Sequence, residues 1–207
     1  MAAMSDYGVP LREQDVDADP LAQFGSWFQQ AAQAGVREPQ AAALATASGD
    51  GVPSARMVLV KAFDERGFVF YSHYAGRKAR ELAANPRAAL LFHWDPLGRQ
   101  VRIEGSVEHT STEESAAYAR SRPRASRLSA LASPQSQTLA SREQLEIRVR
   151  ELEHEYADRE LPIPSDWGGF RLAAESFEFW QQRHDRLHDR LRYRRDHGGW
   201  LLERLAP

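Results

Sequence analysis

The amino-acid sequence predicts a mainly β fold of the α+β class, built on one antiparallel sheet or barrel with peripheral helices. Three observations lead to this prediction. Short apolar strands follow one another between tight turns of Gly, Asp and Pro, which is typical of antiparallel pairing. Strand-like segments stand on both sides of a helical stretch, so strands before residue 110 and after residue 168 should share one sheet. A length of 207 residues suits about one domain.

The first half of the chain is predicted to begin with a helix and to continue as strands. Residues 1–18 are expected to be a flexible arm, which leaves 19–207 as a single domain. Asp19 and Pro20 supply an N-cap and a first helical residue, and the helical spacing ends at Gly35. Strands are predicted at 41–47, 55–63, 68–73, 87–94 and 99–110, with a short helix at 76–85.

The second half is predicted as helices packed outside the sheet, followed by the last strands. A helix runs from Thr112 to Pro123, and the Ser- and Pro-rich stretch 124–140 is expected to be loop with short helical turns. An amphipathic helix is predicted over 141–157, with Leu145, Val149, Leu152 and Tyr156 on one face. The remaining strands are predicted at 169–182, 186–195 and 200–207.

The composition excludes several functional classes. A net charge of -2 argues against a general nucleic-acid binder, and the lack of cysteine excludes disulfides, thiol chemistry and Cys-ligated metals. No apolar run approaches the roughly 20 residues that cross a bilayer, and the N-terminal segment lacks a signal-peptide core. We therefore expect a cytoplasmic protein without a membrane partner. P-loop, GxGxxG, HExxH and GxSxG motifs are absent, and we assign no metal ligands.

Lysine is rare in this chain, because Lys61 and Lys78 are the only lysines among 27 basic residues. A chain that uses arginine for generic surface cations would keep lysine where a compact ammonium group is needed. Lys61 ends an apolar strand that begins at Arg56, and residues five apart in a strand point to opposite faces. Codon bias with two chance survivors is the alternative explanation.

Three further segments suit anionic ligands. Gly76-Arg77-Lys78 opens a helix just after Tyr71 and Ser72, where helix N–H groups and two cations favour a phosphate. Tyr118, Arg122 and Ser126 are spaced by four, so on a helix they share one side and suit a phosphate monoester. Ordinary helix ends with surface cations are the alternative for both. The pair Gln135-Ser136 in the next loop and Gln100 at a strand start are weaker signals.

The segment 178–195 is the strongest candidate, because it holds six arginines and two histidines. In a strand, Arg186, His188 and Arg190 would project to one face and form a pocket wall for an anionic or electron-rich ligand. Trp180 could pack against a flat ring. The alternatives are a solvated basic face or a nucleic-acid patch, and the net charge of -2 argues against the patch.

Taken together and in order, these segments resemble the pyridoxine/pyridoxamine 5'-phosphate oxidase family of flavin enzymes. The matching segments are RMVLVK (56–61), FVFYS (68–72), GRKARELAANPRAALLFHW (76–94), RQVRIEG (99–105), YARSRPRAS (118–126), PQS (134–136), WGGFRL (167–172) and the block from EFWQQRHDRLHDR to RLAP (178–207). The resemblance implies a homodimer of six-stranded antiparallel Greek-key split β-barrels with FMN at the dimer interface. It also implies oxidation of pyridoxine or pyridoxamine 5'-phosphate by O2, which yields pyridoxal 5'-phosphate and hydrogen peroxide.

The resemblance also assigns roles to residues. Contacts with FMN are implied for Arg56, Met57, Val58, Leu59, Val60, Lys61, Tyr71, Ser72, Arg77, Lys78, Gln100, Gln135, Ser136, Trp180 and Arg190. The substrate phosphate would be held by Lys61, Tyr118, Arg122 and Ser126. Arg186 and His188 would sit over the pyridine ring as the catalytic pair, where they orient the substrate.

Several positions depart from the usual family pattern around the substrate. Ser129 and Leu131 stand where Gly and Trp are common, Gln182 replaces a Gly, and Ala119 replaces an aromatic residue. The arm before residue 10 also lacks an Arg-Arg-Glu-Tyr-like segment. Two alternatives therefore stay open: a related flavin oxidase of phenazine type, and a non-catalytic carrier of FMN or pyridoxal phosphate. The phosphate-binding set favours the vitamin B6 enzyme, because a phenazine precursor has no phosphate.

Overall fold

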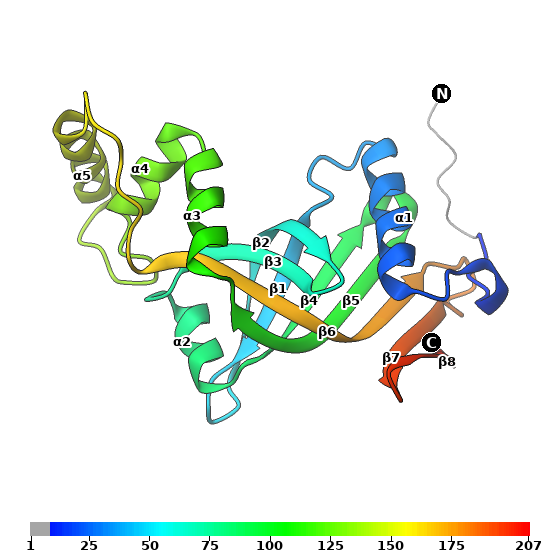
Figure 1. Cartoon of the computed structure of the whole chain (residues 1–207). Helices are drawn as coiled ribbons and strands as arrows, with labels where there is room; N and C mark the ends of the chain where they lie inside the picture. Colours follow the sequence, from blue (N-terminus) through cyan, green and yellow to red (C-terminus); the bar gives the residue numbers. More distant parts are fainter. Residues whose placement is uncertain (1–8) are drawn as a thin grey trace.

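The computed structural model describes residues 9–207, and its centre is one antiparallel sheet (Figure 1). The eight strands follow the order β3-β2-β1-β4-β5-β6-β7-β8, and a further pairing of β3 with β6 closes six of them into a barrel. The strands are β1 (Ala41–Ala47), β2 (Pro53–Asp64), β3 (Gly67–His73), β4 (Arg87–Trp94), β5 (Arg99–His109), β6 (Trp167–Gln181), β7 (Asp189–Asp196) and β8 (Gly199–Leu205). The predicted six-stranded antiparallel barrel is confirmed.

Strand β6 is the longest element and links the two ends of the molecule. Its first part pairs with β3, most of its length from Phe170 to Gln181 pairs with β5, and its last part pairs with β7. The register of β5 and β6 shifts between Glu104 and Gly105, where Glu175 of β6 is the extra residue of a bulge. An added Cβ at Gly105 would clash with the carbonyl of Ala173, so this close approach requires glycine. The expectation that strands before residue 110 and after residue 168 share one sheet is therefore correct.

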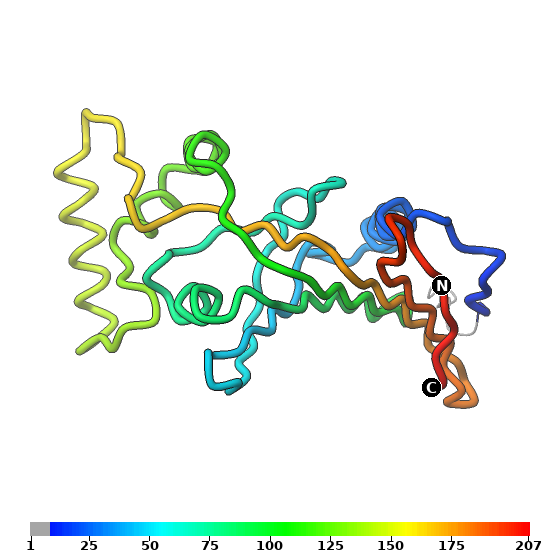
Figure 2. Tube along the Cα trace, turned by 60° about the horizontal axis from the view of Figure 1, so that its bottom comes forward, coloured from blue at the N-terminus to red at the C-terminus, as the bar shows by residue number. Residues whose placement is uncertain are grey.

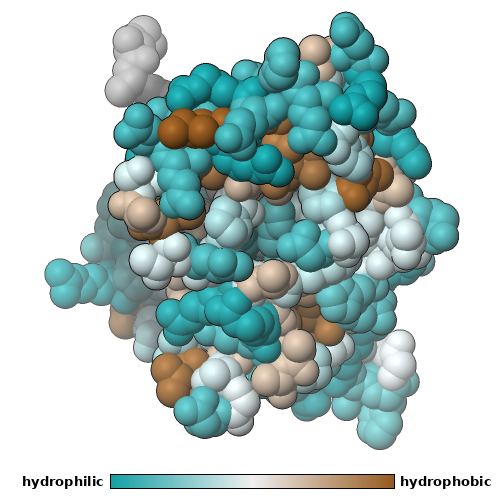
Figure 3. Space-filling view, turned by 90° about the vertical axis from the view of Figure 1, so that its left-hand side faces the viewer, coloured by the Kyte–Doolittle hydropathy of each residue, from teal (hydrophilic) through white to brown (hydrophobic). Residues whose placement is uncertain are grey.

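The helices gather at the two ends of the barrel (Figures 1 and 2). They are α1 (Pro20–Gln33), α2 (Arg77–Ala84), α3 (Thr112–Ser121), α4 (Arg124–Ala132) and α5 (Arg142–Glu155), with single 3-10 turns at Glu13–Asp15 and Asp95–Leu97. Asp19 caps α1 by accepting a hydrogen bond from the Leu21 N–H, as its sequence predicts. The end that bears α4 and α5 is mostly hydrophilic with separate hydrophobic spots (Figure 3).

Helix α4 is longer than the short helical turns that were expected within a loop over 124–140. Its Leu128 and Ala132 are buried against Leu152 of α5, in a small core separate from the barrel. Serine and alanine give this segment little periodic signal, so its helical state depends on packing against α5. The four apolar residues predicted on one face of α5 do belong to this second core.

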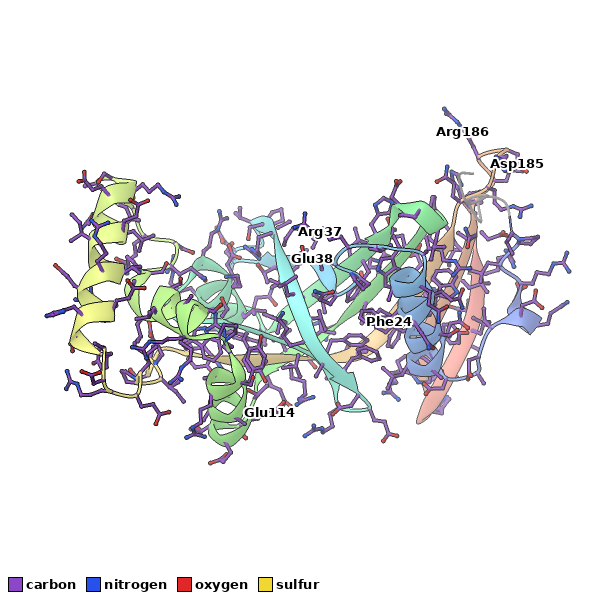
Figure 4. All side chains as sticks on the ribbon, turned by 90° about the horizontal axis from the view of Figure 1, so that it is seen from above. Phe24, Arg37, Glu38, Glu114, Asp185 and Arg186 are labelled. Carbon is purple, nitrogen blue, oxygen red and sulfur yellow. The ribbon has the colours of Figure 1, made fainter. Side chains whose placement is uncertain are left out.

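A second correction concerns the segment predicted as a strand over 186–195. Strand β7 begins only at Asp189, and residues 182–188 form a loop in which Arg186 has a positive φ of 63°. The Asp185 carboxylate accepts a hydrogen bond from the Leu187 N–H, which stabilises a turn. Arg186, His188 and Arg190 therefore do not form one strand row, and Arg186 points away from the barrel at the loop tip (Figure 4).

The segment before α1 is fastened to the C-terminal hairpin. Leu11 is buried, and its N–H donates to Asp189 of β7 over 3.1 Å. Arg204 of β8 pairs with Glu13 at 2.7 Å, and the Tyr193 hydroxyl donates to the Asp17 carbonyl at 2.6 Å. Of the flexible arm expected over 1–18, residues 1–8 lie outside the described residues.

Aromatic packing joins α1 to the barrel. Phe24 is fully buried, and its ring centroid lies 4.9 Å from Phe63, 5.0 Å from Phe68 and 5.0 Å from Phe92. These contacts are edge-to-face or tilted, which aromatic pairs prefer. Within residues 9–207, no helix is both long and apolar enough to cross a membrane.

The central position of Phe24 predicts that its side chain contributes strongly to the free energy of unfolding. Phe24→Ala should lower the free energy of unfolding by about 3–5 kcal/mol, because it leaves a cavity among buried rings. Urea titration at one fixed protein concentration measures this loss. Phe28→Ala, at a half-buried position on the same helix, is the control and should cost less. Equal losses for both variants would contradict the central role of Phe24.

Candidate functional site

A cavity of about 530 Å³ lies between the barrel and the α3–α4 turn, and we call it the α3–α4 cavity. It brings together most of the residues that the sequence suggests for phosphate binding. The predicted site residues on its walls are Leu59, Lys61, Tyr71, Ser72, Tyr118, Arg122, Ser126 and Gln135. Strands β2 and β3 and the turn between α3 and α4 therefore converge on one space.

Tyr118, Arg122 and Ser126 line this cavity, but they do not lie on one helix as their spacing of four predicted. Helix α3 ends at Ser121, Arg122 adopts an extended conformation, and α4 starts after Pro123. Tyr118, Arg122 and Ser126 therefore do not share one helix face. The chain reversal at Pro123 still turns all three toward the same cavity.

An aromatic stack forms one wall of the α3–α4 cavity. The rings of Tyr71 and Tyr118 lie 3.8 Å apart and nearly parallel, and Trp167 lies 5.5 Å from Tyr71 at an angle of 12°. Burial, with the negative charge of Glu114 adding to it, raises the pKa of Tyr71 to about 12. Burial also raises the pKa of Tyr118. Both hydroxyls therefore stay protonated at neutral pH and can donate hydrogen bonds.

The cations of the cavity have no carboxylate partner. Among residues 9–207, no Asp or Glu lies within ion-pair distance of Lys61 or Arg122. The buried Arg171, by contrast, is neutralised by Glu114 at 2.7 Å and Asp64 at 3.1 Å. A half-buried guanidinium beside hydroxyl groups and without a carboxylate is suited to an anion from solution.

A second polar group surrounds the start of α2, next to the cavity. The Lys78 ammonium donates to the Ser72 hydroxyl at 2.8 Å and to the Gln135 side-chain oxygen at 2.7 Å. The Arg77 N–H donates to Ser136, and a Cβ on Gly76 would lie 2.6 Å from the Gln135 oxygen. Burial, followed by the nearby charge of Arg56, lowers the pKa of Lys78. Helix N–H groups and these cations make a cradle for a phosphate.

Glu81 is a buried residue that the sequence analysis did not single out. Its carboxylate accepts hydrogen bonds from Arg77 at 2.7 Å and Arg56 at 3.1 Å, and from the hydroxyls of Thr46 and Ser54. Burial alone would raise the pKa of Glu81, but these hydrogen bonds outweigh it and lower the pKa to about 2. Glu81 follows Arg77 by four residues within a predicted helix, and this spacing was the sequence signal that could have indicated their ion pair.

Strand β2 carries the remaining predicted residues on alternating faces. Arg56 points toward Glu81, while Leu59 and Lys61 line the cavity, which agrees with the prediction of opposite faces for Arg56 and Lys61. Val60 is buried, but Met57 is 65% exposed.

The other predicted site residues lie at the opposite end of the molecule (Figures 1 and 2). Gln100, Trp180 and Arg190 are neighbours across β5, β6 and β7. Glu178 accepts from Arg190 at 2.8 Å and from Arg102 at 2.5 Å. This group and the α3–α4 cavity stand at opposite ends of β6, because Trp180 lies 13 residues along the strand from Trp167, roughly 40 Å at the full strand rise.

The loop 182–188 holds the predicted catalytic pair at this far end. His188 packs against Trp180 with ring centroids 4.6 Å apart, and its Nδ1 accepts the Arg183 N–H at 3.1 Å. A neutral His188 therefore carries its proton on Nε2. Arg186 is exposed and points into solvent (Figure 4). The structure thus separates Arg186 and His188 from the phosphate-binding candidates within one chain.

Comparison with known proteins decides the family. Residues 28–156 match the family described as pyridoxamine 5'-phosphate oxidase, and residues 167–207 match a region described as the pyridoxine 5'-phosphate oxidase C-terminal dimerisation region. The chain belongs to the pyridoxamine 5'-phosphate oxidase family. The resemblance stated from the sequence is therefore confirmed.

Two relatives illustrate how close this family membership is. The chain is 57% identical over 197 residues to the pyridoxine/pyridoxamine 5'-phosphate oxidase of Rubrobacter xylanophilus, which covers 95% of this chain and 91% of that protein. It is 55% identical over 195 residues to the enzyme of the same name from Paraburkholderia phytofirmans, with 93% and 91% covered.

Solved structures support the same fold. PhzG from Burkholderia lata, in complex with tetrahydrophenazine-1-carboxylic acid, superimposes with a TM-score of 0.92 at 35% identity, over 98% of this chain and 100% of that chain. A pyridoxamine 5'-phosphate oxidase-related, FMN-binding protein from Nostoc punctiforme gives a TM-score of 0.70 at 15% identity, with 96% and 100% covered, which shows the fold alone.

The low pKa of Glu81 predicts a pH-dependent stability. Because its folded-state pKa of about 2 lies below its ordinary value of 4.5, the stabilisation is present above about pH 4.5 and is lost as pH falls toward 2. Glu81→Gln should therefore lower the unfolding free energy by about 1–3 kcal/mol at pH 7. Urea titrations at several pH values should show this difference shrinking below about pH 4.5.

Glu143→Gln, at an exposed position on α5, is the matched control for the removal of a negative charge. It should leave the unfolding free energy nearly unchanged across the same pH series. A Glu81→Gln difference that stays constant from pH 7 to pH 3.5 would contradict the role given to the Glu81 carboxylate.

Proposed function

We propose that this protein is an FMN-dependent oxidase that converts pyridoxine 5'-phosphate or pyridoxamine 5'-phosphate to pyridoxal 5'-phosphate. Oxygen is the electron acceptor and hydrogen peroxide is the product. The observation that carries the proposal is the α3–α4 cavity, where Lys61 and Arg122 lack carboxylate partners and stand beside the hydroxyls of Tyr118 and Ser126. Two cations and two hydroxyls suit a phosphate monoester. Relatives above 50% identity that are named for this activity support it.

The residues at the start of α2 fit the phosphate of FMN. Lys78, Arg77 and Ser136 gather a cation, backbone N–H groups and a hydroxyl at the start of α2, where the lack of a side chain at Gly76 lets Gln135 approach closely. Tyr71 and Ser72 stand between this cradle and the α3–α4 cavity, so the cofactor and the substrate would lie side by side. When bound, FMN supplies the redox chemistry, as acceptor of a hydride from the substrate and donor of electrons to O2.

We further propose that the working enzyme is a homodimer in which each site takes residues from both chains. Gln100, Trp180, Arg186, His188 and Arg190 lie too far from the α3–α4 cavity to act there within one protomer. The dimerisation region matched over residues 167–207 contains four of these five residues, which supports their delivery to the partner. The exposed Met57 lies on the side of β2 that faces away from the core.

The chain's own residues then act by binding and orientation. Lys61 and Arg122 hold the substrate phosphate, with hydrogen bonds from Tyr118 and Ser126. The Arg183 N–H fixes the ring of His188, which leaves its Nε2–H free to donate to the substrate. Arg186, which is exposed at the tip of the loop 182–188, brings a cation to the pyridine ring of the substrate. We assign this pair to orientation, because hydride transfer depends on position more than on a strong base.

A phenazine-type oxidation is the second candidate function, and one observation favours it. PhzG shares the fold at 35% identity and was solved with tetrahydrophenazine-1-carboxylic acid. Ser129, one of the departures from the family pattern, lines the α3–α4 cavity, whereas Leu131 packs against the α4–α5 core. A carboxylate could pair with Arg122, but the full set of two cations and two hydroxyls matches a phosphate better.

Aerobic turnover tests the proposed function. The FMN-loaded protein is incubated with pyridoxine 5'-phosphate, and pyridoxal 5'-phosphate and peroxide are followed together. Equal amounts of both products, formed catalytically and much faster than with unphosphorylated pyridoxine, are expected. Absence of both products from a flavin-loaded protein would contradict the proposal, and oxidation of a phenazine precursor instead would favour the second candidate.

Loss of a phosphate-binding cation should act on substrate binding. Arg122→Leu should raise the KM for pyridoxine 5'-phosphate roughly 10- to 100-fold, with kcat changed less than about threefold, because a charge-assisted contact is removed. Steady-state kinetics at constant flavin content measure both values. Arg120→Leu, an exposed arginine on α3, is the matched control and should behave as the native protein. An unchanged KM in Arg122→Leu would refute the assignment of Arg122.

A further inference from the structure

The segment Trp167-Gly168-Gly169, at the start of β6, has no part in the function proposed so far. The sequence shows it as a distinct motif, yet none of its residues is among the candidate contacts to cofactor or substrate. Trp167 is buried, with 7% of its surface exposed, and it lines the α3–α4 cavity. Its indole ring therefore stands where it can act on the phosphate-binding residues.

The two glycines allow β6 to lie directly against the neighbouring rings. Gly169 pairs with Tyr71 across the β3–β6 register, and a Cβ at Gly169 would lie 2.9 Å from a Tyr71 ring carbon. A Cβ at Gly168 would clash with the Tyr74 hydroxyl. Any side chain at these positions would push β6 outward. The glycines thus fix the position of Trp167 relative to Tyr71.

Trp167 contacts two parts of the phosphate-binding set at once. The ring planes of Trp167 and Tyr118 are parallel within 9°, and their centroids lie 6.2 Å apart. Trp167 also stacks on Tyr71. The guanidinium carbon of Arg122 lies 4.9 Å from the indole centroid. With no carboxylate near, this cation–π contact is the interaction that orients the Arg122 side chain within the described residues.

We propose that Trp167 is a positioning residue that holds Arg122 toward the substrate phosphate and thereby sets the preference for phosphorylated over unphosphorylated substrates. The proposal rests on the proposed function, since it takes the α3–α4 cavity as the phosphate site. An aromatic face orients the guanidinium without neutralising it, whereas a carboxylate would compete with the incoming phosphate. Without that face, a long arginine side chain would regain rotamer freedom that binding must remove.

Binding of two ligands that differ only in the phosphate tests this role. The FMN-loaded, full-length protein is titrated calorimetrically with pyridoxal 5'-phosphate and with pyridoxal, for the native chain, Trp167→Leu and Trp167→Phe. In Trp167→Leu the Kd for pyridoxal 5'-phosphate should rise about 10-fold, while the Kd for pyridoxal stays unchanged. Trp167→Phe keeps an aromatic face and should lose only about threefold.

Kinetics separate positioning from a general structural defect. In Trp167→Leu, the KM for pyridoxine 5'-phosphate should rise about 10-fold with kcat and flavin content unchanged. In an Arg122→Leu background, adding Trp167→Leu should have no further effect on the Kd for pyridoxal 5'-phosphate, because the contact is already lost. Trp200→Leu is the matched control. Trp200 makes the same kind of cation–π contact, with the guanidinium carbon of Arg195 4.0 Å from its ring centroid, but it lies in the β7–β8 hairpin.

The outcomes separate the two proposals. A native protein that binds pyridoxal 5'-phosphate no more tightly than pyridoxal contradicts the proposed function itself. A native preference that survives unchanged in Trp167→Leu, or that falls equally in Trp200→Leu, overturns the role of Trp167 and leaves the proposed function intact. Should Trp167→Leu not fold, Trp167→Phe decides: a threefold loss that disappears in the Arg122→Leu background supports the role, and no loss overturns it.

Discussion

The pairing of β3 with β6 is the constraint on which the rest of the structure depends. It closes the six-stranded barrel and sets Tyr71 against Gly169 and His73 against Trp167. The α3–α4 cavity is therefore built at the β6 start, while the other end of the same strand carries Trp180 beside Gln100 and Arg190. One continuous strand thus carries two groups of candidate residues, one at each end, and the proposed homodimer would bring the two groups of different chains together.

Charge neutralisation distinguishes structural arginines from those available to a ligand. Arg171, Arg190 and Arg204 each pair with buried or nearby carboxylates, and they tie strands, α3 and the N-terminal segment to one another. Glu81 likewise pairs with Arg56 and Arg77 at the start of α2. In the α3–α4 cavity, by contrast, Lys61 and Arg122 keep their charge uncompensated, and Arg122 is oriented by an aromatic ring. The proposed phosphate would supply the negative charge that carboxylates supply to the other arginines.

Local sequence patterns predict the parts of the fold that local chemistry determines. Apolar strands between Gly- and Asp-containing turns, and the Asp19 cap of α1, follow from short-range rules, and the ordered family segments indicate the fold and the candidate residues. Helix α4 and the loop 182–188 were missed, because α4 depends on packing against α5 and the loop on contacts of Asp185 and His188. The sequence also did not predict that the candidate residues fall into two groups at opposite ends of the chain's fold. This separation depends on strand length and on the register between strands, which residue spacing does not indicate.

Restoration of activity in mixed dimers tests the central claim, a site shared between two protomers, most directly. One chain lacks the charges of Lys61 and Arg122, the other carries Arg186→Ala, and each is assayed alone and after subunit exchange at low substrate concentration. If sites are shared, random exchange makes one intact site in every mixed dimer, and about a quarter of native activity should return. Activity that never exceeds the average of the two separate variants would contradict the claim and place the complete site within a single chain.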